Sequence, residues 1–148
     1  MKHLFIDMDG VIADYVNINT NKAIINDYNV PGIFLQKEPC QTMIKSIINL
    51  FPKEKYCYHI LSASPTEMGI EEKNQWLDKY FNIEDRYFVK YPDESKAKFI
   101  SEWCYLSNVN IEDCYLIDDT QRHLKEFELV GGNPIHPIHI LVLNEKNI

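Results

Sequence analysis

The chain has 148 residues, of which 45% are hydrophobic and 25% are charged. This length corresponds to about one domain. The composition is ordinary for a soluble globular protein, which excludes a disordered, collagen-like or membrane-embedded chain. Fifteen Lys and Arg residues against 22 Asp and Glu residues give a net charge of −7. Because an acidic chain is repelled by phosphate backbones, duplex nucleic acid is not an expected partner.

The N-terminus and the cysteines bear on the cellular compartment. The short apolar run after His3 is interrupted at once by Asp7 and Asp9, unlike a secretory signal peptide. No window approaches the roughly 18 apolar residues of a membrane helix. None of the four cysteines pairs with another at C-x-x-C spacing, so we expect reduced, mostly buried thiols. These features predict a cytoplasmic protein without a membrane segment.

Apolar runs that favour strands alternate with helical patterns, which is typical of an α/β domain with a mostly parallel sheet. We expect strands at 4–6, 56–61, 87–89 and 114–117, and a weaker fifth strand at 138–143. Helical patterns cover 42–50, 71–81, 93–104 and 121–130, and Gly131-Gly132 ends the last of them. Near-continuous apolar strands indicate a sheet covered by helices on both faces.

One segment, residues 15–41, fits this alternation poorly because it combines Asn-rich stretches with Pro31-Gly32 and Glu38-Pro39. It predicts a small insertion after the first strand, helical with a loop. The segment is too short for a core of its own and should pack over the main domain. We therefore expect a core domain of residues 1–14 and 51–148, and a small cap of residues 15–50.

Carboxylates stand at the ends of two predicted strands. Asp7-Met8-Asp9-Gly10 follows the first strand, and Asp118-Asp119 follows the strand at 114–117. The carboxyl ends of parallel strands meet at one edge of the sheet, where ligands bind. Four carboxylates gathered there repel one another unless a hard cation with oxygen ligands binds them, and Mg²⁺ is the natural candidate.

Two further residues suggest a phosphate site near these carboxylates. Ser62 follows the apolar run at 58–61, so its hydroxyl and the next backbone N–H groups face the same edge. Lys96 opens the helix after the strand at 87–89 and can neutralise a carboxylate while binding phosphate.

The histidines show no metal-ligand spacing. His3, His59 and His123 are far apart in the sequence, and we expect them to be structural or surface residues. His136 and His139 are separated by two residues, but no third ligand is obvious beside them.

Together these residues resemble the four motifs of the haloacid dehalogenase (HAD) superfamily of phosphohydrolases. The resemblance covers residues 1–14 and about 56–136, and its motifs are Asp7–Asp14, Leu61–Pro65, Lys96–Ile100 and Leu116–Asp119. It implies a Rossmann-like core with a cap inserted after the first motif. It also implies hydrolysis of a phosphomonoester with Mg²⁺ as cofactor.

The resemblance assigns roles to the carboxylates. It makes Asp7 the nucleophile that forms an aspartyl-phosphate, and Asp9 the general acid that then activates water. Mg²⁺ is bound by Asp7, by the backbone carbonyl of Asp9 and by the acids of the fourth motif. Of the two acids in the fourth motif, we favour Asp119 as the direct ligand. Asp118 would then contact the direct ligands or bind the ion through water.

The resemblance also implies that Ser62 and the lysine of the third motif hold the phosphoryl group. Lys96 matches the Lys-Ala-x-Phe pattern of that motif best, while Lys90 and Lys98 remain alternatives. Positioning and neutralisation of charge then contribute most of the catalysis.

Within the superfamily, the chain resembles the 5′(3′)-deoxyribonucleotidase group and its small bacterial and phage relatives. The residues that suggest this are the first motif, the run Glu72–Leu77, Gly131-Gly132 and His136. The implied substrate is a nucleoside monophosphate. Tyr15, Tyr28, Ile33 and Phe34 could stack on its base, or form the small core of the cap.

Other functions remain open. The substrate could instead be another small phosphate ester or a polynucleotide end, because a small cap leaves the site open. A non-catalytic binding protein on the same fold is a further alternative. The sequence does not indicate an oligomeric state.

Overall fold

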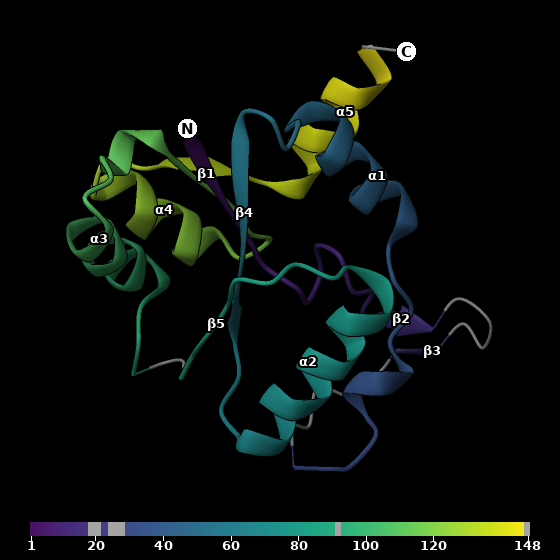
Figure 1. Cartoon of the computed structure of the whole chain (residues 1–148). Coiled ribbons are helices and arrows are strands. Elements are labelled where there is room, and N and C mark those ends of the chain that lie inside the picture. Colours follow the sequence, from purple (N-terminus) through teal and green to yellow (C-terminus); the bar gives the residue numbers. More distant parts are fainter. Residues whose placement is uncertain (18–21, 24–28, 91–92, 147–148) are drawn as a thin grey trace.

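A computed structural model describes residues 1–17, 22–23, 29–90 and 93–146 of the chain (Figure 1). Five parallel strands form one sheet in the order β5-β4-β1-β6-β7. The strands are β1 (Lys2–Ile6), β4 (Tyr56–Ala63), β5 (Arg86–Val89), β6 (Cys114–Ile117) and β7 (Asn133–Ile135). The predicted parallel α/β fold is confirmed, and β1 with the first acidic motif lies at the centre of the sheet.

Helices cover both faces of this sheet. They are α1 (Gln41–Leu50), α2 (Glu67–Tyr80), α3 (Lys96–Ser107), α4 (Gln121–Leu129) and α5 (Pro137–Lys146), with single turns η1 (Phe34–Gln36) and η2 (Ile111–Asp113). Leu4 and Ile6 of β1 pack in one buried cluster with α1, α2 and α5, whereas Phe5 packs in a second cluster with α3 and α4. Because side chains alternate along a strand, β1 contributes to the core on both of its faces.

Local signals place the helix ends close to the expected positions. Thr66 caps α2 by accepting a hydrogen bond from Gly69 N, and Ser95 caps α3 in the same way from Lys98 N. Helix α4 ends just before Gly131, which adopts a φ of 97°, as predicted. Within the described residues, no helix has the length and apolar composition needed to cross a bilayer.

The predicted strand at 138–143 is wrong. These residues belong to helix α5, and the fifth strand is β7, just before it. Pro137 occupies the first position of the helix, where a missing N–H costs nothing. Ile140 is fully buried in the cluster that includes α1, while Ile138 is 58% exposed. The run is apolar enough for a strand, but its buried and exposed positions alternate with the period of a helix.

The range 15–50 contains more than a small helical cap. Strands β2 (Val16–Asn17) and β3 (Lys22–Ala23) form an antiparallel pair, and η1 follows. Helix α1 contributes Met43 and Ile47 to the same buried cluster as β1. This helix therefore packs with the core layer, and the expected division between cap and core at residue 50 stays a prediction.

Two substitutions test whether residues 137–146 form a helix. In a strand, residues 138 and 140 would share one face, whereas in a helix they lie on opposite faces. We expect Ile140→Ala to lower the free energy of unfolding by about 2–5 kcal/mol, because it leaves a cavity in the core. Ile138→Ala should change it by less than about 0.5 kcal/mol. Denaturant unfolding measures both values, and similar costs for the two variants would contradict the helix.

Candidate active site

The motif residues meet at the carboxyl edge of the three central strands. Asp7 follows β1, Asp118 and Asp119 follow β6, and Ser62 lies near the end of β4. Each of the three aspartates Asp7, Asp118 and Asp119 offers a carboxylate oxygen, and these oxygens lie within 4.8 Å of one another. The expected convergence of carboxylates at this edge is thus present in the structure.

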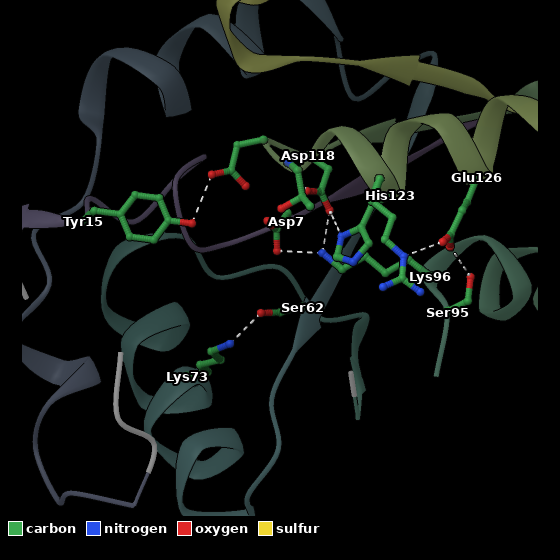
Figure 2. Close-up of polar contacts among 12 residues, drawn as sticks. Asp7, Tyr15, Ser62, Lys73, Ser95, Lys96, Asp118, His123 and Glu126 are labelled. Atoms are coloured by element: carbon green, nitrogen blue, oxygen red, sulfur yellow. Dashed lines mark hydrogen bonds and ion pairs between the residues drawn. The ribbon is translucent and has the colours of Figure 1, made fainter. Parts of the chain in front are cut away.

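Lys96 lies between two of these carboxylates (Figure 2). Its Nζ is 2.9 Å from Asp7 Oδ1 and 2.6 Å from Asp118 Oδ2, and its side chain is almost fully buried. Burial alone would lower the pKa of Lys96, but the two carboxylates outweigh it and raise the pKa. Lys90 and Lys98, the alternatives for this position, are exposed.

Both carboxylate oxygens of Asp118 have bonding partners. Its Oδ1 accepts a hydrogen bond from Thr120 N at 2.8 Å, and its Oδ2 lies 3.2 Å from His123 Nδ1 and next to Lys96. Burial favours the neutral acid, but the bonds from His123, Lys96 and Thr120 outweigh it and lower the pKa of Asp118. A fully buried carboxylate that already serves these donors is suited to organise the site rather than to bind a cation directly.

Asp119 has a different environment. Its Oδ2 accepts a hydrogen bond from Tyr15 OH at 3.0 Å, and burial raises the pKa of the carboxyl group. Its residue is partly exposed, unlike Asp118. Asp119 is therefore the fourth-motif acid with room for a further ligand.

A tight turn after β1 brings Asp119 close to the first motif. Met8 O accepts hydrogen bonds from the backbone N–H groups of Val11, Ile12 and Ala13, and Gly10 adopts a φ of 76°. A Cβ on Gly10 would lie 2.1 Å from Asp119 Oδ2, and this distance is too short for any side chain to be accommodated at position 10. Glycine is thus required here both by the backbone conformation and by the approach of the carboxylate.

Asp9 is paired with two buried lysines that the motifs did not indicate. Lys37 Nζ forms a short ion pair with Asp9 Oδ1, and Lys73 Nζ lies 3.3 Å from Asp9 Oδ2. The backbone of Lys37 is fixed because Trp76 Nε1 donates a hydrogen bond to its carbonyl at 2.9 Å. The segment after η1 therefore contributes a cation to the site.

Lys73 also reaches the predicted phosphate residue. Its Nζ donates to Ser62 Oγ and to Ala63 O, both at 2.7 Å, and burial lowers the pKa of the lysine (Figure 2). The helical spacing of the sequence around Lys73 could have indicated that this lysine is buried. Lys73 precedes the buried residues Trp76 and Leu77 by three and four positions, so a helix places it on the buried face. No comparable local signal marks Lys37, because it lies in an irregular segment.

The aromatic residues expected over the site separate into different roles. Tyr15 is 42% exposed and hydrogen-bonded to Asp119, so it borders the site. Phe34 is buried and meets Trp76 edge-on at 6.1 Å, as expected for a core residue. Ile33 is partly exposed, and Tyr28 lies outside the described residues.

The donor set fits a hard divalent cation. Asp7, Asp118 and Asp119 supply only oxygen atoms, and Mg²⁺ prefers carboxylate oxygens completed by water. Burial raises the pKa of Asp7 to about 7, and its neighbours Asp118 and Asp9 act in the same direction against Lys96. A bound cation would favour the ionised form of Asp7 and so relieve this cost.

No family model matches the sequence, and no curated protein matches it. Solved structures share its fold. HAD family enzyme bt-2542 from Bacteroides thetaiotaomicron, in complex with magnesium and inorganic phosphate, has a TM-score of 0.62 and 12% identity, covering 92% of this chain and 93% of that one. The haloacid dehalogenase-like hydrolase SP0104 from Streptococcus pneumoniae has a TM-score of 0.60 and 13% identity, covering 97% and 98%. A chain of the Pnkp1/Rnl/Hen1 RNA repair complex has a TM-score of 0.60 and 15% identity, covering 92% and 42%. The chain therefore has the fold of HAD family enzymes.

The raised pKa of Asp7 predicts a pH dependence of stability in metal-free protein. Between its ordinary value of 3.8 and about 7, folded Asp7 keeps a proton that the unfolded chain has lost. The free energy of unfolding contributed by Asp7 therefore falls as pH rises through this window. Because other groups also titrate there, the difference between wild type and Asp7→Asn isolates this contribution. Denaturant unfolding in chelator, at about pH 5 and about pH 7, should show a steeper decline in wild type. Equal slopes would contradict the prediction.

Proposed function

We propose that the protein is a Mg²⁺-dependent phosphomonoester hydrolase that forms an aspartyl-phosphate on Asp7. The observation that carries the proposal is the placement of Asp7. It lies at the end of the central strand, bonded to buried Lys96 and beside Asp118 and Asp119. The shared fold adds support, since the similar enzyme bt-2542 binds magnesium and inorganic phosphate.

Mg²⁺ would be held by Asp7, Asp119 and the backbone carbonyl of Asp9. Asp118 would contact these ligands or bind the ion through water. When bound, the ion neutralises phosphate charge and orients the phosphoryl group. Lys96 holds Asp7 and Asp118 in place through two ion pairs, so the nucleophile does not have to reorganise as the reaction begins.

The phosphoryl group would be bound by the Ser62 hydroxyl and by ammonium groups. The sequence predicts Lys96 in this role, and the contact between Lys73 and Ser62 supports Lys73 as a second ammonium group in the same binding site. Both lysines are almost fully buried, so their charges act on phosphate oxygens with little screening by water. Charge placed in this way stabilises the negatively charged oxygens of a phosphoryl transition state.

Asp9 would supply and remove the protons. An oxygen of Asp7 attacks phosphorus, the bond from phosphorus to the leaving oxygen breaks, and that oxygen takes a proton from Asp9. Water then attacks phosphorus while Asp9 takes a proton from it, the bond from phosphorus to the Asp7 oxygen breaks, and inorganic phosphate leaves with Asp7 restored as a carboxylate. In the structure Asp9 is paired with Lys37 and Lys73. A phosphate dianion that draws these ammonium groups to itself would allow Asp9 to carry the proton.

We further propose a nucleoside monophosphate as the substrate, supported by the resemblance of the first motif and by Tyr15 at the border of the site. A 3′-phosphorylated oligonucleotide is the alternative that the similarity to a chain of an RNA repair complex favours. Assays with nucleoside monophosphates, sugar phosphates and such oligonucleotides separate these classes. A clear preference for sugar phosphates would exclude the nucleotide proposal.

Hydrolysis of a generic phosphate ester tests the reaction itself. We expect activity that requires Mg²⁺ and is abolished by chelation. Asp7→Asn should lower kcat by roughly a thousandfold or more, the scale seen when a nucleophile is removed. Asp93→Asn, a change at an exposed aspartate in front of α3, is the matched control and should leave the rate unchanged. Activity that survives Asp7→Asn or ignores chelation would rule out the mechanism.

A second pair of variants tests the role of Lys73. Lys73→Met keeps the length and apolar stem of the side chain but removes the charge next to Ser62. We expect kcat/KM to fall by about 10²–10³-fold, the scale for losing one donor that stabilises a transition state. Lys79→Met, on an exposed position of the same helix, is the control. If both variants hydrolyse the ester at the wild-type rate, Lys73 does not bind the phosphoryl group.

A further inference from the structure

A second group of side chains with potential metal ligands, a cysteine and two histidines, lies at the other end of β1. His3 of β1 is paired in register with Cys57 of β4, and His59 comes two residues later on β4. Because side chains alternate along strands, all three project from the face of the sheet that packs against α3. Ligand atoms of His3, Cys57 and His59 lie within 4.8 Å of one another.

We propose that His3, Cys57 and His59 form a site for a borderline divalent cation, of which Zn²⁺ is the best match. Imidazole nitrogen and thiolate sulfur are both common zinc ligands, and three protein ligands leave the fourth tetrahedral position to water. His3 Nδ1 and His59 Nε2 are 3.0 Å apart, in a hydrogen bond that a bound ion would replace. Two nitrogens bound to one tetrahedral zinc ion at the usual bond lengths lie about 3.3–3.4 Å apart. A small separation of the two rings therefore makes room for the ion.

The opposite nitrogen of His59 faces a carboxylate. His59 Nδ1 lies 3.3 Å from Asp85 Oδ2, and among the described residues this buried nitrogen has no hydrogen-bond partner. Histidines that bind metal through one nitrogen commonly donate the other N–H to a carboxylate, which fixes the tautomer. Asp85 is half exposed and can turn to complete this bond.

Aromatic neighbours pack against both imidazole rings. Trp103 meets His3 edge-on at 5.0 Å and His59 at 4.9 Å, and Phe5 stacks on His59 at 4.6 Å. Burial lowers the pKa of His59 to about 4 and also lowers the pKa of His3. Cys57 is a thiol with a pKa raised by burial. Metal binding therefore forms a bond from sulfur to the ion and releases one proton from Cys57 to solvent.

This site is separate from the carboxylates in position and in chemistry. His3 and Asp7 are four residues apart on one extended segment, roughly 13 Å at the usual rise of a strand. One end of β1 offers nitrogen and sulfur, and the other end offers oxygen. The partial exposure of His3 and Cys57 gives an ion access and leaves a position for water. A bound ion would join β1 to β4 independently of the proposed phosphatase reaction.

Cobalt spectroscopy on the full chain tests the proposal, with Mg²⁺ in excess to occupy the carboxylate site. We expect one equivalent of Co²⁺ to give visible bands of a tetrahedral ion together with a thiolate-to-cobalt charge-transfer band, and Zn²⁺ to displace it. Cys57→Ser should abolish the charge-transfer band, and His3→Gln should weaken binding at least tenfold. Cys40→Ser, at another partly exposed cysteine, should leave the spectrum unchanged.

Thermal unfolding supplies a second measurement. Zn²⁺ should raise the Tm of wild-type protein and of Asp119→Asn, but not that of Cys57→Ser. Circular dichroism establishes that each variant is folded. A charge-transfer band that persists in Cys57→Ser, Co²⁺ binding that disappears in Asp119→Asn, or no binding by folded wild-type protein would each overturn the proposal.

Discussion

The site depends on one buried ammonium group placed between two buried carboxylates. Lys96 contacts both Asp7 and Asp118, and water reaches none of the three freely. Without it, burial and the mutual repulsion of two neighbouring carboxylates would raise the pKa of Asp7 further, because Lys96 is the group that lowers it. Removing one member of such a buried group costs about 3–5 kcal/mol, because it leaves the partner charge unpaired. The fold provides this lysine at the first position of α3, directly after the capping residue Ser95.

The balance of charge explains how a strongly acidic edge can accept a phosphate. Four carboxylates, when ionised, face three buried lysines at positions 37, 73 and 96, which leaves one net negative charge (3 − 4 = −1). A divalent cation changes this to one net positive charge, which suits a phosphate dianion. Counted with its lysines, the site therefore contributes one of the seven net negative charges of the chain. In this balance Lys37 and Lys73 offset the negative charge of the whole site as well as that of Asp9.

The features of the site that can be predicted are those that depend on short stretches of sequence. Apolar runs followed by Asp7-Met8-Asp9-Gly10 and Asp118-Asp119 identify strand ends, because a parallel sheet brings those ends to one edge. Lys37 depends on an irregular segment held by a hydrogen bond from Trp76, and the proximity of His3 to Cys57 depends on strand register. Both are tertiary relations with no local signature. The apolar run at 138–143 became a helix because packing against α1, rather than local preference, decides its structure.

The most direct test of the central claim is to find the phosphoryl group on Asp7 itself. Asp9→Asn protein should still be phosphorylated by an aryl phosphate, because this leaving group needs no proton, but should hydrolyse the intermediate slowly. Acid quenching, reduction with borohydride and peptide mass spectrometry would then locate the acyl phosphate. The account predicts Mg²⁺-dependent conversion of Asp7, and of no other aspartate, to homoserine. Modification of a different residue, or release of phosphate with Asp7 unmodified, would contradict it.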